Sequence, residues 1–264
     1  MSRKKIGLAL SGGGARGFAH VGVLKVLGEH NIPVDFIAGT SIGSFVGGAF
    51  ASGMSATEVE TMALNVRWAN LTRPSFSTIA LLSNAPMGKF IERNFPTHKF
   101  EDLTIPFAAV TCDLKAEQIV VKKDQGDIVP AIRASCAVPA VFSPIREDDR
   151  LLVDGGVMSL VPIDVVKALG ADVVIAVDLI SSGAGFTRYP STAVGMLFLS
   201  AMVMLRSACE NQQNKADVMI IPKIAHIRPD KLNQREECLR LGEEAARQQI
   251  DEIKRVIYED NSEQ

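Results

Sequence analysis

The sequence predicts an α/β fold in which a mostly parallel central sheet is sandwiched by helices, a three-layer arrangement within a single domain. Short apolar runs rich in β-branched residues alternate with helical patterns, and this alternation is typical of βαβ units. The length agrees, since 264 residues with 47% hydrophobic residues can bury one full core. We therefore expect one domain over residues 1–264, with a core at about 6–180 and helical and strand elements over 190–258.

The expected strands are the apolar runs IGLAL, DFIAG, PFAAVTCDL, QIVVKK, LLVDG, DVVIAVDL and ADVMIIP. Residues 15–29 carry apolar side chains at the spacing of a crossover helix packed on the sheet. A second helix begins at Ser55, because Glu58 three residues later completes a capping box. The stretch REECLRLGEEAARQQIDEIKRVIY near the end of the chain predicts an amphipathic surface helix.

Three further segments have weaker patterns. Residues 73–90, RPSFSTIALLSNAPMGKF, lack a clean period and carry apolar side chains that look exposed, so they form a mobile cap or lipid-contacting flap, or else an ordinary packed loop. Residues 193–205, AVGMLFLSAMVML, fall well short of the ~20 residues of a spanning helix, and we expect a buried helix rather than an interfacial one. Residues 183–192 are expected to form a loop.

The composition excludes several functional classes. The formal charge of −2, from 28 basic and 30 acidic residues, lacks the basic surplus of a nucleic-acid-binding protein. The 4 cysteines show neither C-x-x-C spacing nor a nearby histidine cluster, so we expect no metal, no cofactor and no disulfide framework. The basic start MSRKK precedes too short an apolar run for an export signal, and reduced thiols fit a cytoplasmic protein.

The motif G-x-S-x-G, formed by Gly39, Ser41 and Gly43, lies between the second expected strand and a helix of small residues. In this context it predicts a nucleophile elbow, because the two glycines tolerate a tight turn that lifts the serine side chain above the sheet. A glycine-rich turn whose serine caps the helix is the plainer alternative. The strand before the motif and the helix after it favour the elbow.

A second motif, SGGGARG at residues 11–17, follows the first expected strand. Loops after successive parallel strands emerge at the same edge of a sheet, so this loop and Ser41 should be close neighbours. Glycine N–H groups beside a nucleophile make an oxyanion hole. Arg16 adds a positive charge that either attracts an anionic substrate or braces the loop.

The same loop contains G-x-G-x-x-G, the fingerprint of dinucleotide binding. That function requires an acidic residue at the end of the second strand to bind a ribose hydroxyl. Asp35 has roughly the right sequence distance, but it begins the strand and therefore lies at the wrong edge of the sheet. Dinucleotide binding stays as the lesser alternative.

A serine nucleophile needs a base, and Asp154 ends another expected strand in LLVDGGV, followed by Gly155 and Gly156. The carboxyl end of this strand can deliver Asp154 to the same edge of the sheet. Read alone, the tripeptide fits an Asp-Gly turn of a surface hairpin equally well. Of the 4 histidines only His226 has the chain order of a Ser, Asp, His triad, and an ordinary polar loop is just as plausible there.

The motifs SGGGARG, GTSIG and VDGG in this order, with ASCAVPAVFSP between the last two, resemble the patatin-like phospholipase family of bacteria. The resemblance runs from about residue 6 to beyond residue 178. It implies a Ser–Asp dyad without histidine, with Ser41 as nucleophile, Asp154 as base, Gly12, Gly13 and Gly14 as the oxyanion loop, and Arg16 as the arginine of that loop.

The resemblance further implies a serine esterase that acts on phospholipid, lysophospholipid or another fatty ester. The alternative is a regulatory protein that keeps the fold and binds a partner with little hydrolysis, and the intact dyad favours the enzyme. Such substrates lie in bilayers, so we expect reversible contact with the inner membrane face. The candidate contacts are residues 79–87 and, second, residues 196–205.

Overall fold

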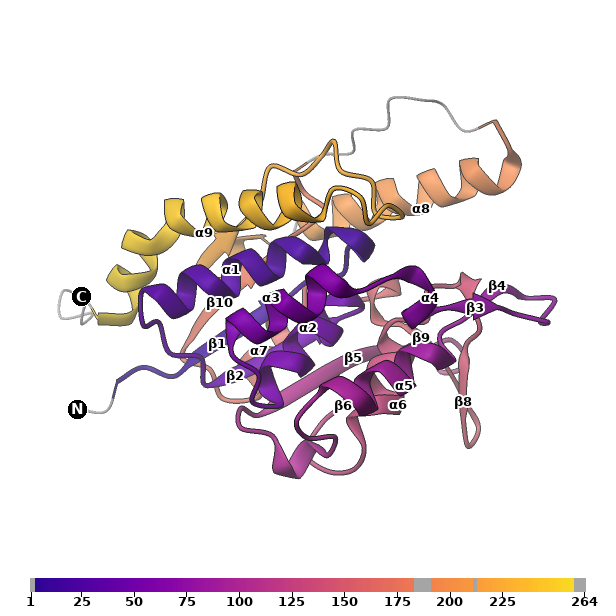
Figure 1. The fold of residues 1–264 in the computed structure, drawn as a ribbon, viewed down its shortest axis with the longest axis horizontal. Helices are drawn as coiled ribbons and strands as arrows, with labels where there is room; N and C mark the ends of the chain where they lie inside the picture. Colours follow the sequence, from indigo (N-terminus) through magenta and orange to yellow (C-terminus); the bar gives the residue numbers. More distant parts are fainter. Residues whose placement is uncertain (1–2, 183–190, 211–212, 259–264) are drawn as a thin grey trace.

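The structure is a computed structural model that describes residues 3–182, 191–210 and 213–258. Within these residues an eight-stranded sheet lies between two layers of helices (Figure 1), as the sequence predicts. Its strands follow the order β11-β10-β1-β2-β5-β9-β8, and β6 pairs with β5 beside this path. A separate small sheet has the order β3-β4-β7.

The parallel part of the large sheet contains five strands that all run the same way, namely β11 (Val218–Ile220), β10 (Val173–Val177), β1 (Ile6–Leu10), β2 (Phe36–Thr40) and β5 (Phe107–Asp113). Each corresponds to a strand expected from the sequence. Because β1 and β2 are parallel neighbours, the loops that follow them emerge at one edge. This carboxyl edge carries the motifs described below.

The remaining strands of the large sheet are antiparallel to their neighbours: β6 (Gln118–Lys122), β8 (Ile145–Glu147) and β9 (Arg150–Asp154). Strand β9 begins beyond the carboxyl edge and runs back towards it, so that Asp154 pairs with Thr111. Val110, the residue before Thr111, pairs with Thr40. Asp154 therefore reaches the predicted edge at the end of an antiparallel strand.

Two apolar layers flank the sheet. One face is covered by α1 (Phe18–Glu29), α2 (Ile42–Ala51), α3 (Ala56–Asn65), α5 (Ala85–Asn94), α6 (Ile128–Ser135) and α9 (Arg235–Tyr258). The other face is covered by α7 (Ile163–Ala168) and α8 (Ala193–Glu210). The short α4 (Trp68–Leu71) and the 3-10 turns η1 (Gly14–Gly17), η2 (Phe100–Asp102), η3 (Gly155–Val157) and η4 (Gln213–Lys215) complete the described elements.

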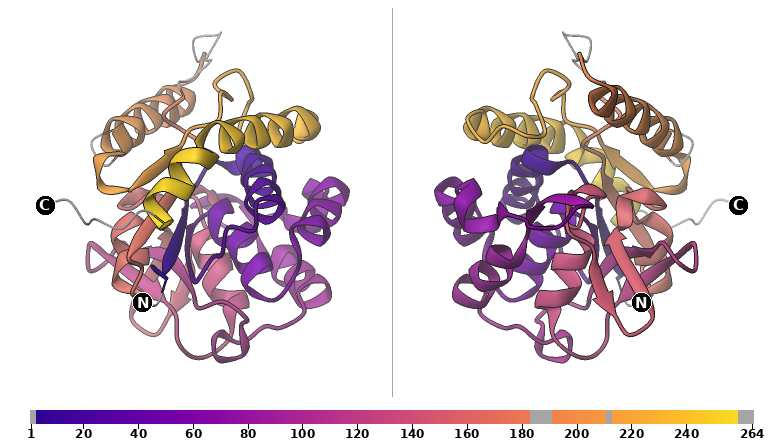
Figure 2. Two further views of the ribbon diagram at one scale, coloured as in Figure 1. Left: turned by 90° about the vertical axis from the view of Figure 1, so that its left-hand side faces the viewer. Right: turned by 90° about the vertical axis from the view of Figure 1, so that its right-hand side faces the viewer.

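Helix α9 lies along α1, as both end-on views show (Figure 2). The two backbones touch through glycines: a Cβ added at Gly22 would lie 2.1 Å from the carbonyl oxygen of Leu239, and one at Gly242 would lie 2.2 Å from that of Ala19. The helix is amphipathic, as predicted, and its buried side includes Cys238, Leu239, Ala246, Ile250, Ile253 and Ile257. Each leucine or isoleucine side chain among them contributes about 1.5–3 kcal/mol when fully buried.

The segment 73–90 contains a short β-hairpin, formed by β3 (Arg73–Pro74) and β4 (Ala80–Ser83), and the first turns of α5. Strand β4 also pairs with β7 (Ala140–Phe142). Phe76, Ile79 and Leu81 are exposed, so an ordinary packed loop is the wrong description of this stretch. Sequence patterns missed these strands because each is too short to show an alternation.

Helix α8 forms where the sequence predicts it, but the expectation of a buried helix is wrong. Met196, Leu197, Val203 and Met204 are exposed. The reason is that α8 is apolar on several sides, whereas the sheet covers one of them. The predicted loop at 183–192 falls almost entirely outside the described residues. None of the helices in the described part of the chain has the length and hydropathy needed to cross a bilayer.

Candidate active site

Ser41 lies in a sharp turn between β2 and α2, with φ 53° and ψ −126°, a backbone conformation that is strained for a residue with a side chain. A Cβ added at Gly39 would lie 2.4 Å from the carbonyl oxygen of Gly43, and one at Gly43 would lie 2.1 Å from that of Leu10. Both glycines are therefore required by close backbone approach. The turn places Ser41 at the N-terminus of α2, where the helix dipole favours negative charge.

The elbow is fixed from below by Ser135, the last residue of α6. The backbone N–H of Ser41 donates to the Ser135 hydroxyl oxygen at 2.9 Å, and that hydroxyl donates to the carbonyl oxygen of Val110 at 2.6 Å. Sequence reasoning noted the stretch ASCAVPAVFSP but gave Ser135 no role. The contact joins residues 94 positions apart, which no local pattern indicates.

Asp154 is buried, with 5% of its surface exposed, and its carboxylate lies close enough to the hydroxyl of Ser41 for a hydrogen bond from it to favour the ionised form. A second hydrogen bond comes from the backbone N–H of Gly156 to Oδ1 at 2.8 Å. Burial raises the pKa of Asp154 to about 6, against the opposing effect of these two hydrogen bonds. The carboxylate is therefore a stronger base than an exposed aspartate, and the structure brings the two predicted residues together.

The glycine directly after Asp154 is also required for steric reasons. A Cβ added at Gly155 would lie 2.3 Å from the carbonyl oxygen of Val110, so only glycine fits there. The backbone N–H of Asp154 donates to the carbonyl oxygen of Ala137 at 2.9 Å. The neighbouring thiol of Cys136 has a pKa raised far above its ordinary value by burial and by the charge of Asp154. It stays neutral and adds to the poorly solvated surroundings of the carboxylate.

The loop SGGGARG lies against the elbow, since a Cβ added at Gly12 would be 3.3 Å from Cβ of Ser41. The N–H of Gly12 already donates to the carbonyl oxygen of Leu160 at 3.1 Å. Among the hydrogen bonds of the described residues, none uses the N–H of Gly13 or Gly14 as donor. The loop thus offers two amides without a hydrogen-bond acceptor among these residues, where the sequence analysis expected three.

Arg16 is buried and donates to three backbone carbonyl oxygens: Nε to Ile227 at 2.8 Å, Nη1 to Leu179 at 3.1 Å and Nη2 to Ala225 at 3.1 Å. Burial lowers the pKa of its guanidinium, although not enough to remove the charge. These contacts favour the bracing role over attraction of an anionic substrate. They attach the glycine loop to chain segments more than 160 residues away.

Two residues missed by the sequence analysis hold the start of the loop. The hydroxyl of Ser11 accepts from the N–H of Leu179 at 3.0 Å. The ring of His20, fully buried in α1, has Nε2 at 2.8 Å from the carbonyl oxygen of Ser11. Burial lowers the pKa of His20 to about 4, so the ring is neutral and Nε2 carries the donated proton. A histidine on an otherwise apolar helix face was the available signal.

His226, on which a triad depends, and Asp35, on which dinucleotide binding depends, both make their contacts away from Ser41. Nε2 of His226 is 2.9 Å from the carboxylate of Glu237, and the His226 side chain is 54% exposed. Asp35 accepts from the N–H of Ile6 at 2.7 Å and pairs with Arg3, which places it at the amino edge of the sheet. The described residues contain no group of three His, Cys, Asp or Glu side chains able to hold a metal ion.

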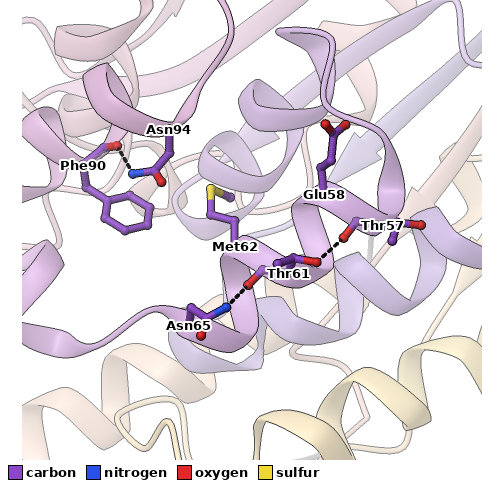
Figure 3. A pocket seen from close by; sticks show the side chains of 7 residues that line it. All are labelled: Thr57, Glu58, Thr61, Met62, Asn65, Phe90 and Asn94. Carbon is purple, nitrogen blue, oxygen red and sulfur yellow. Dashed lines mark hydrogen bonds between the residues drawn. The ribbon is translucent and has the colours of Figure 1, made fainter.

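A surface pocket of 370 Å³ lies between α3 and α5 (Figure 3) and is lined by Thr57, Glu58, Thr61, Met62, Asn65, Phe90 and Asn94. Three of its polar side chains donate hydrogen bonds within their own helices. Thr61 donates to the carbonyl oxygen of Thr57, Asn65 to that of Thr61 and Asn94 to that of Phe90. None of the residues of the Ser41 site lines this pocket.

Residues 8–167, more than half of the chain, match the family model described as patatin-like phospholipase. The chain belongs to this family. It is 36% identical over 184 residues to patatin-like phospholipase domain-containing protein 6 of Mus musculus, an alignment that covers 66% of this chain and 13% of that protein. It is also 36% identical over 210 residues to an NTE family protein of Mycobacterium bovis, covering 78% of this chain and 58% of that protein.

The patatin-like chain thus spans less than two thirds of the length of either relative. Among solved structures, VipD from Legionella pneumophila has the same fold, with a TM-score of 0.65 over 95% of this chain and 67% of that one. The two sequences are 14% identical, so this likeness concerns the fold alone. The family resemblance and the fold class expected from the sequence are both confirmed.

Proposed function

We propose that the protein is a serine hydrolase of fatty acyl esters, of phospholipase A or lysophospholipase type, that works with a Ser41–Asp154 dyad. The observation that carries the proposal is the hydrogen bond from the Ser41 hydroxyl to the buried carboxylate of Asp154, beside a loop with free amides. Family membership supports the lipid substrate class.

In the proposed reaction, Asp154 accepts the proton of Ser41 while Oγ attacks the ester carbonyl carbon. The alcohol leaves with that proton, and an acyl-enzyme remains on Ser41. A water molecule then attacks the acyl group while Asp154 again takes the proton, and Asp154 passes this proton to Oγ of Ser41 as the fatty acid is released, which restores the free enzyme. The pKa of about 6 supports this role, because the carboxylate is ionised at neutral pH yet basic enough to accept a proton.

The negative charge that develops on the carbonyl oxygen needs preorganised donors. We assign this role to the backbone N–H groups of Gly13 and Gly14, since that of Gly12 is occupied by Leu160. Removing one such donor typically costs about 2.7–4 kcal/mol of barrier stabilisation. Gly12 instead allows the loop to pack closely, since a Cβ added there would lie 2.6 Å from Cδ1 of Leu160 and 3.3 Å from Cβ of Ser41. The N-terminus of α2 adds a favourable dipole.

The alternatives fit the molecule less well. A protein that only binds partners has no need for a strained serine bonded to a buried carboxylate, because both features lower stability. A Ser, Asp, His triad would need the imidazole of His226 on Asp154, but this ring lies on Glu237. Dinucleotide binding lacks its acidic residue at the carboxyl edge, since Asp35 lies at the other end of β2.

A fluorophosphonate probe tests the nucleophile, because an activated serine beside an oxyanion hole attacks such phosphorus centres. We expect one labelled site, lost in Ser41→Ala and kept in the matched control Ser52→Ala, whose buried hydroxyl donates to the carbonyl oxygen of Ala49. Released fatty acids are then identified by mass spectrometry after incubation with a total lipid extract. Full labelling of Ser41→Ala, or no fatty acid release by the wild type, contradicts the proposal.

A further inference from the structure

The β3–β4 hairpin, residues 73–83, projects from the end of the molecule opposite the start of β1 and the end of α9 (Figure 1). Strand β1 starts near the N-terminus and runs away from it, so the hairpin lies towards the carboxyl edge of the sheet. Its apolar side chains are open to solvent: Phe76 is 106% exposed, Ile79 59% and Leu81 72%. Large apolar side chains grouped at one tip mark a contact surface rather than a packing need.

The chain segment that contains the hairpin differs in charge from the whole chain. The chain has 30 acidic residues and a net charge of −2, yet residues 61–91 contain no Asp or Glu. The same stretch contains the basic residues Arg67, Arg73 and Lys89. Arg73, the first residue of the hairpin, is exposed and has no salt-bridge partner among the described residues. Apolar side chains beside unpaired cations match the chemistry of an anionic lipid surface.

The hairpin is joined to the candidate active site by backbone hydrogen bonds. Strand β4 pairs with β7, with Ala80 opposite Ala140 and Leu82 opposite Phe142. The segment just before β7 contains Ser135, which holds Ser41, and Ala137, which accepts from the N–H of Asp154. Only a short stretch of chain therefore separates β7, which pairs with the hairpin, from the residues that contact Ser41 and Asp154.

Two further exposed apolar residues lie directly after the motif Asp154-Gly155-Gly156. Val157 is 43% exposed and Met158 is 45% exposed. They belong to the same edge of the sheet as Asp154. The hairpin and this turn thus both present apolar side chains towards the carboxyl edge of the sheet, the edge at which Ser41 lies. The view onto this end is the right-hand picture of Figure 2.

We propose that the hairpin docks the protein on bilayers that contain anionic phospholipid, with Phe76, Ile79 and Leu81 among the acyl chains and Arg73 at the level of the phosphates. The proposal rests on the proposed function, whose substrates lie in such a bilayer. A second protein molecule is a poorer occupant, since stable protein interfaces bury about 800 Å² per partner, which is a far larger patch than three side chains on a hairpin tip.

The test is flotation with vesicles of phosphatidylcholine alone or mixed with phosphatidylglycerol. We expect the wild type to float with the mixed vesicles and less with the neutral ones. The triple variant Phe76→Ser/Ile79→Ser/Leu81→Ser should bind at least about 100-fold more weakly, on the scale of apolar side-chain transfer. The matched control is Tyr258→Ser, which removes an exposed aromatic side chain, 64% exposed, at the opposite end of the molecule. It should bind like the wild type.

Arg73→Gln separates the electrostatic part. It should weaken binding to the mixed vesicles about fivefold and leave binding to neutral vesicles unchanged. The loss of binding to the mixed vesicles should be smaller at high salt. Equal binding of the wild type to both kinds of vesicle would overturn the assignment to anionic lipid. Circular dichroism confirms that each variant is folded.

Hydrolysis of a short-chain ester in solution distinguishes failure of docking from failure of the proposed function. The triple variant should keep its kcat/KM on that ester within about twofold while losing activity on vesicles. If the wild type hydrolyses the soluble ester but does not float, or if the triple variant floats like the wild type, the docking proposal is wrong and the hydrolase proposal stands. If no ester is hydrolysed at all, the proposed function fails instead.

A second arm tests the competing surface on α8. The variant Leu197→Ser/Met204→Ser removes two exposed side chains of that helix and should reduce flotation by no more than about threefold. Loss of binding in this variant, with binding retained in the hairpin variant, would overturn the proposal. A second result would also overturn the proposal. If light scattering gives a lower molecular mass for the hairpin variant than for the wild type, and flotation is unchanged, the hairpin joins two copies of the chain.

Discussion

The two ends of strand β2 each have an aspartate within reach, and the two carboxylates have opposite properties. At the amino edge, Asp35 pairs with Arg3 and accepts from the N–H of Ile6, and the Arg3 hydrogen bond holds its pKa below the ordinary value. At the carboxyl edge, Asp154 has no cationic partner among its described contacts, and burial raises its pKa to about 6. The carboxylate of Asp35 is stabilised by Arg3 and Ile6 and holds two chain segments together. The carboxylate of Asp154 has no such cation and is therefore the stronger base.

The largest expected effect is on turnover. Asp154→Asn keeps the size of the side chain but removes the charge that accepts the Ser41 proton, so kcat on a fatty ester should fall by at least ~10²-fold. Asp35→Asn, the matched change at the amino edge, should stay within about twofold of the wild type. Steady-state kinetics on one ester compares them. A similar loss in both variants would mean that the aspartate at the carboxyl edge has no special role.

The pH dependence sharpens the same contrast. The base form of Asp154 is present above its pKa, so kcat/KM should rise about tenfold per pH unit up to about pH 6 and level off above it. The measurement is a kcat/KM profile on a neutral ester between pH 4 and 8. A midpoint near the ordinary value of about 4 would show that burial does not tune this carboxylate.

Stability should respond with opposite signs at the two positions. The folded-state pKa of Asp154 lies about two units above the unfolded value, so ionising it costs stability, which falls as pH rises from about 4 to about 6. Asp154→Asn should therefore raise the free energy of unfolding at pH 8, by on the order of 2–3 kcal/mol. Asp35 has a lowered pKa and contributes stability above pH 4. Asp35→Asn should lower stability by about 1 kcal/mol in urea titrations.

His20 acts through the backbone of the glycine loop and not on substrate. His20→Ala should lower kcat about tenfold with KM nearly unchanged, because the carbonyl of Ser11 loses its donor and the amides of Gly13 and Gly14 shift. His20→Asn, which keeps a donor of similar reach, should recover part of the loss. Equal defects in kcat and KM, with no recovery by asparagine, would indicate a merely structural position.

The smallest expected effect is that of His226→Ala, which should leave kcat within a few-fold of the wild type. Its ring bonds the carboxylate of Glu237 at an exposed position. Activity on one ester and circular dichroism are measured together. A loss as large as that of Asp154→Asn would replace the dyad by a triad.

What the sequence could predict follows from how local each feature is. The elbow is readable because the steric need for Gly39 is set by Gly43 and Ser44 a few positions away, although the need for Gly43 is set by Leu10 on the neighbouring strand. The lost amide of Gly12 was not readable, since its acceptor is Leu160. Arg16 left two roles open for the same reason, because its acceptors lie beyond residue 178.

The elements show the same limit. Strands β1, β2, β5 and β10 are long apolar runs, and all were predicted. Strands β3, β4, β7 and β8 contain two to four residues each and owe their existence to pairing partners. Periodicity identified α8 as a helix, but which of its apolar sides meets the sheet depends on the tertiary fold.

The hydrogen-bond acceptors of Arg16 show that the end of the family match at residue 167 is not the end of the unit that holds the glycine loop. Leu179, Ala225 and Ile227 supply its carbonyl oxygens, and Pro229 accepts from the N–H of Ala15, all beyond the matched residues 8–167. A fragment cut at residue 167 would keep both members of the dyad and every glycine of the loop. It would also leave a guanidinium without the acceptors that hold it. Under the proposed function, the smallest transplantable catalytic unit therefore includes these C-terminal segments, although the proposed nucleophile Ser41 and the proposed base Asp154 both lie before residue 167.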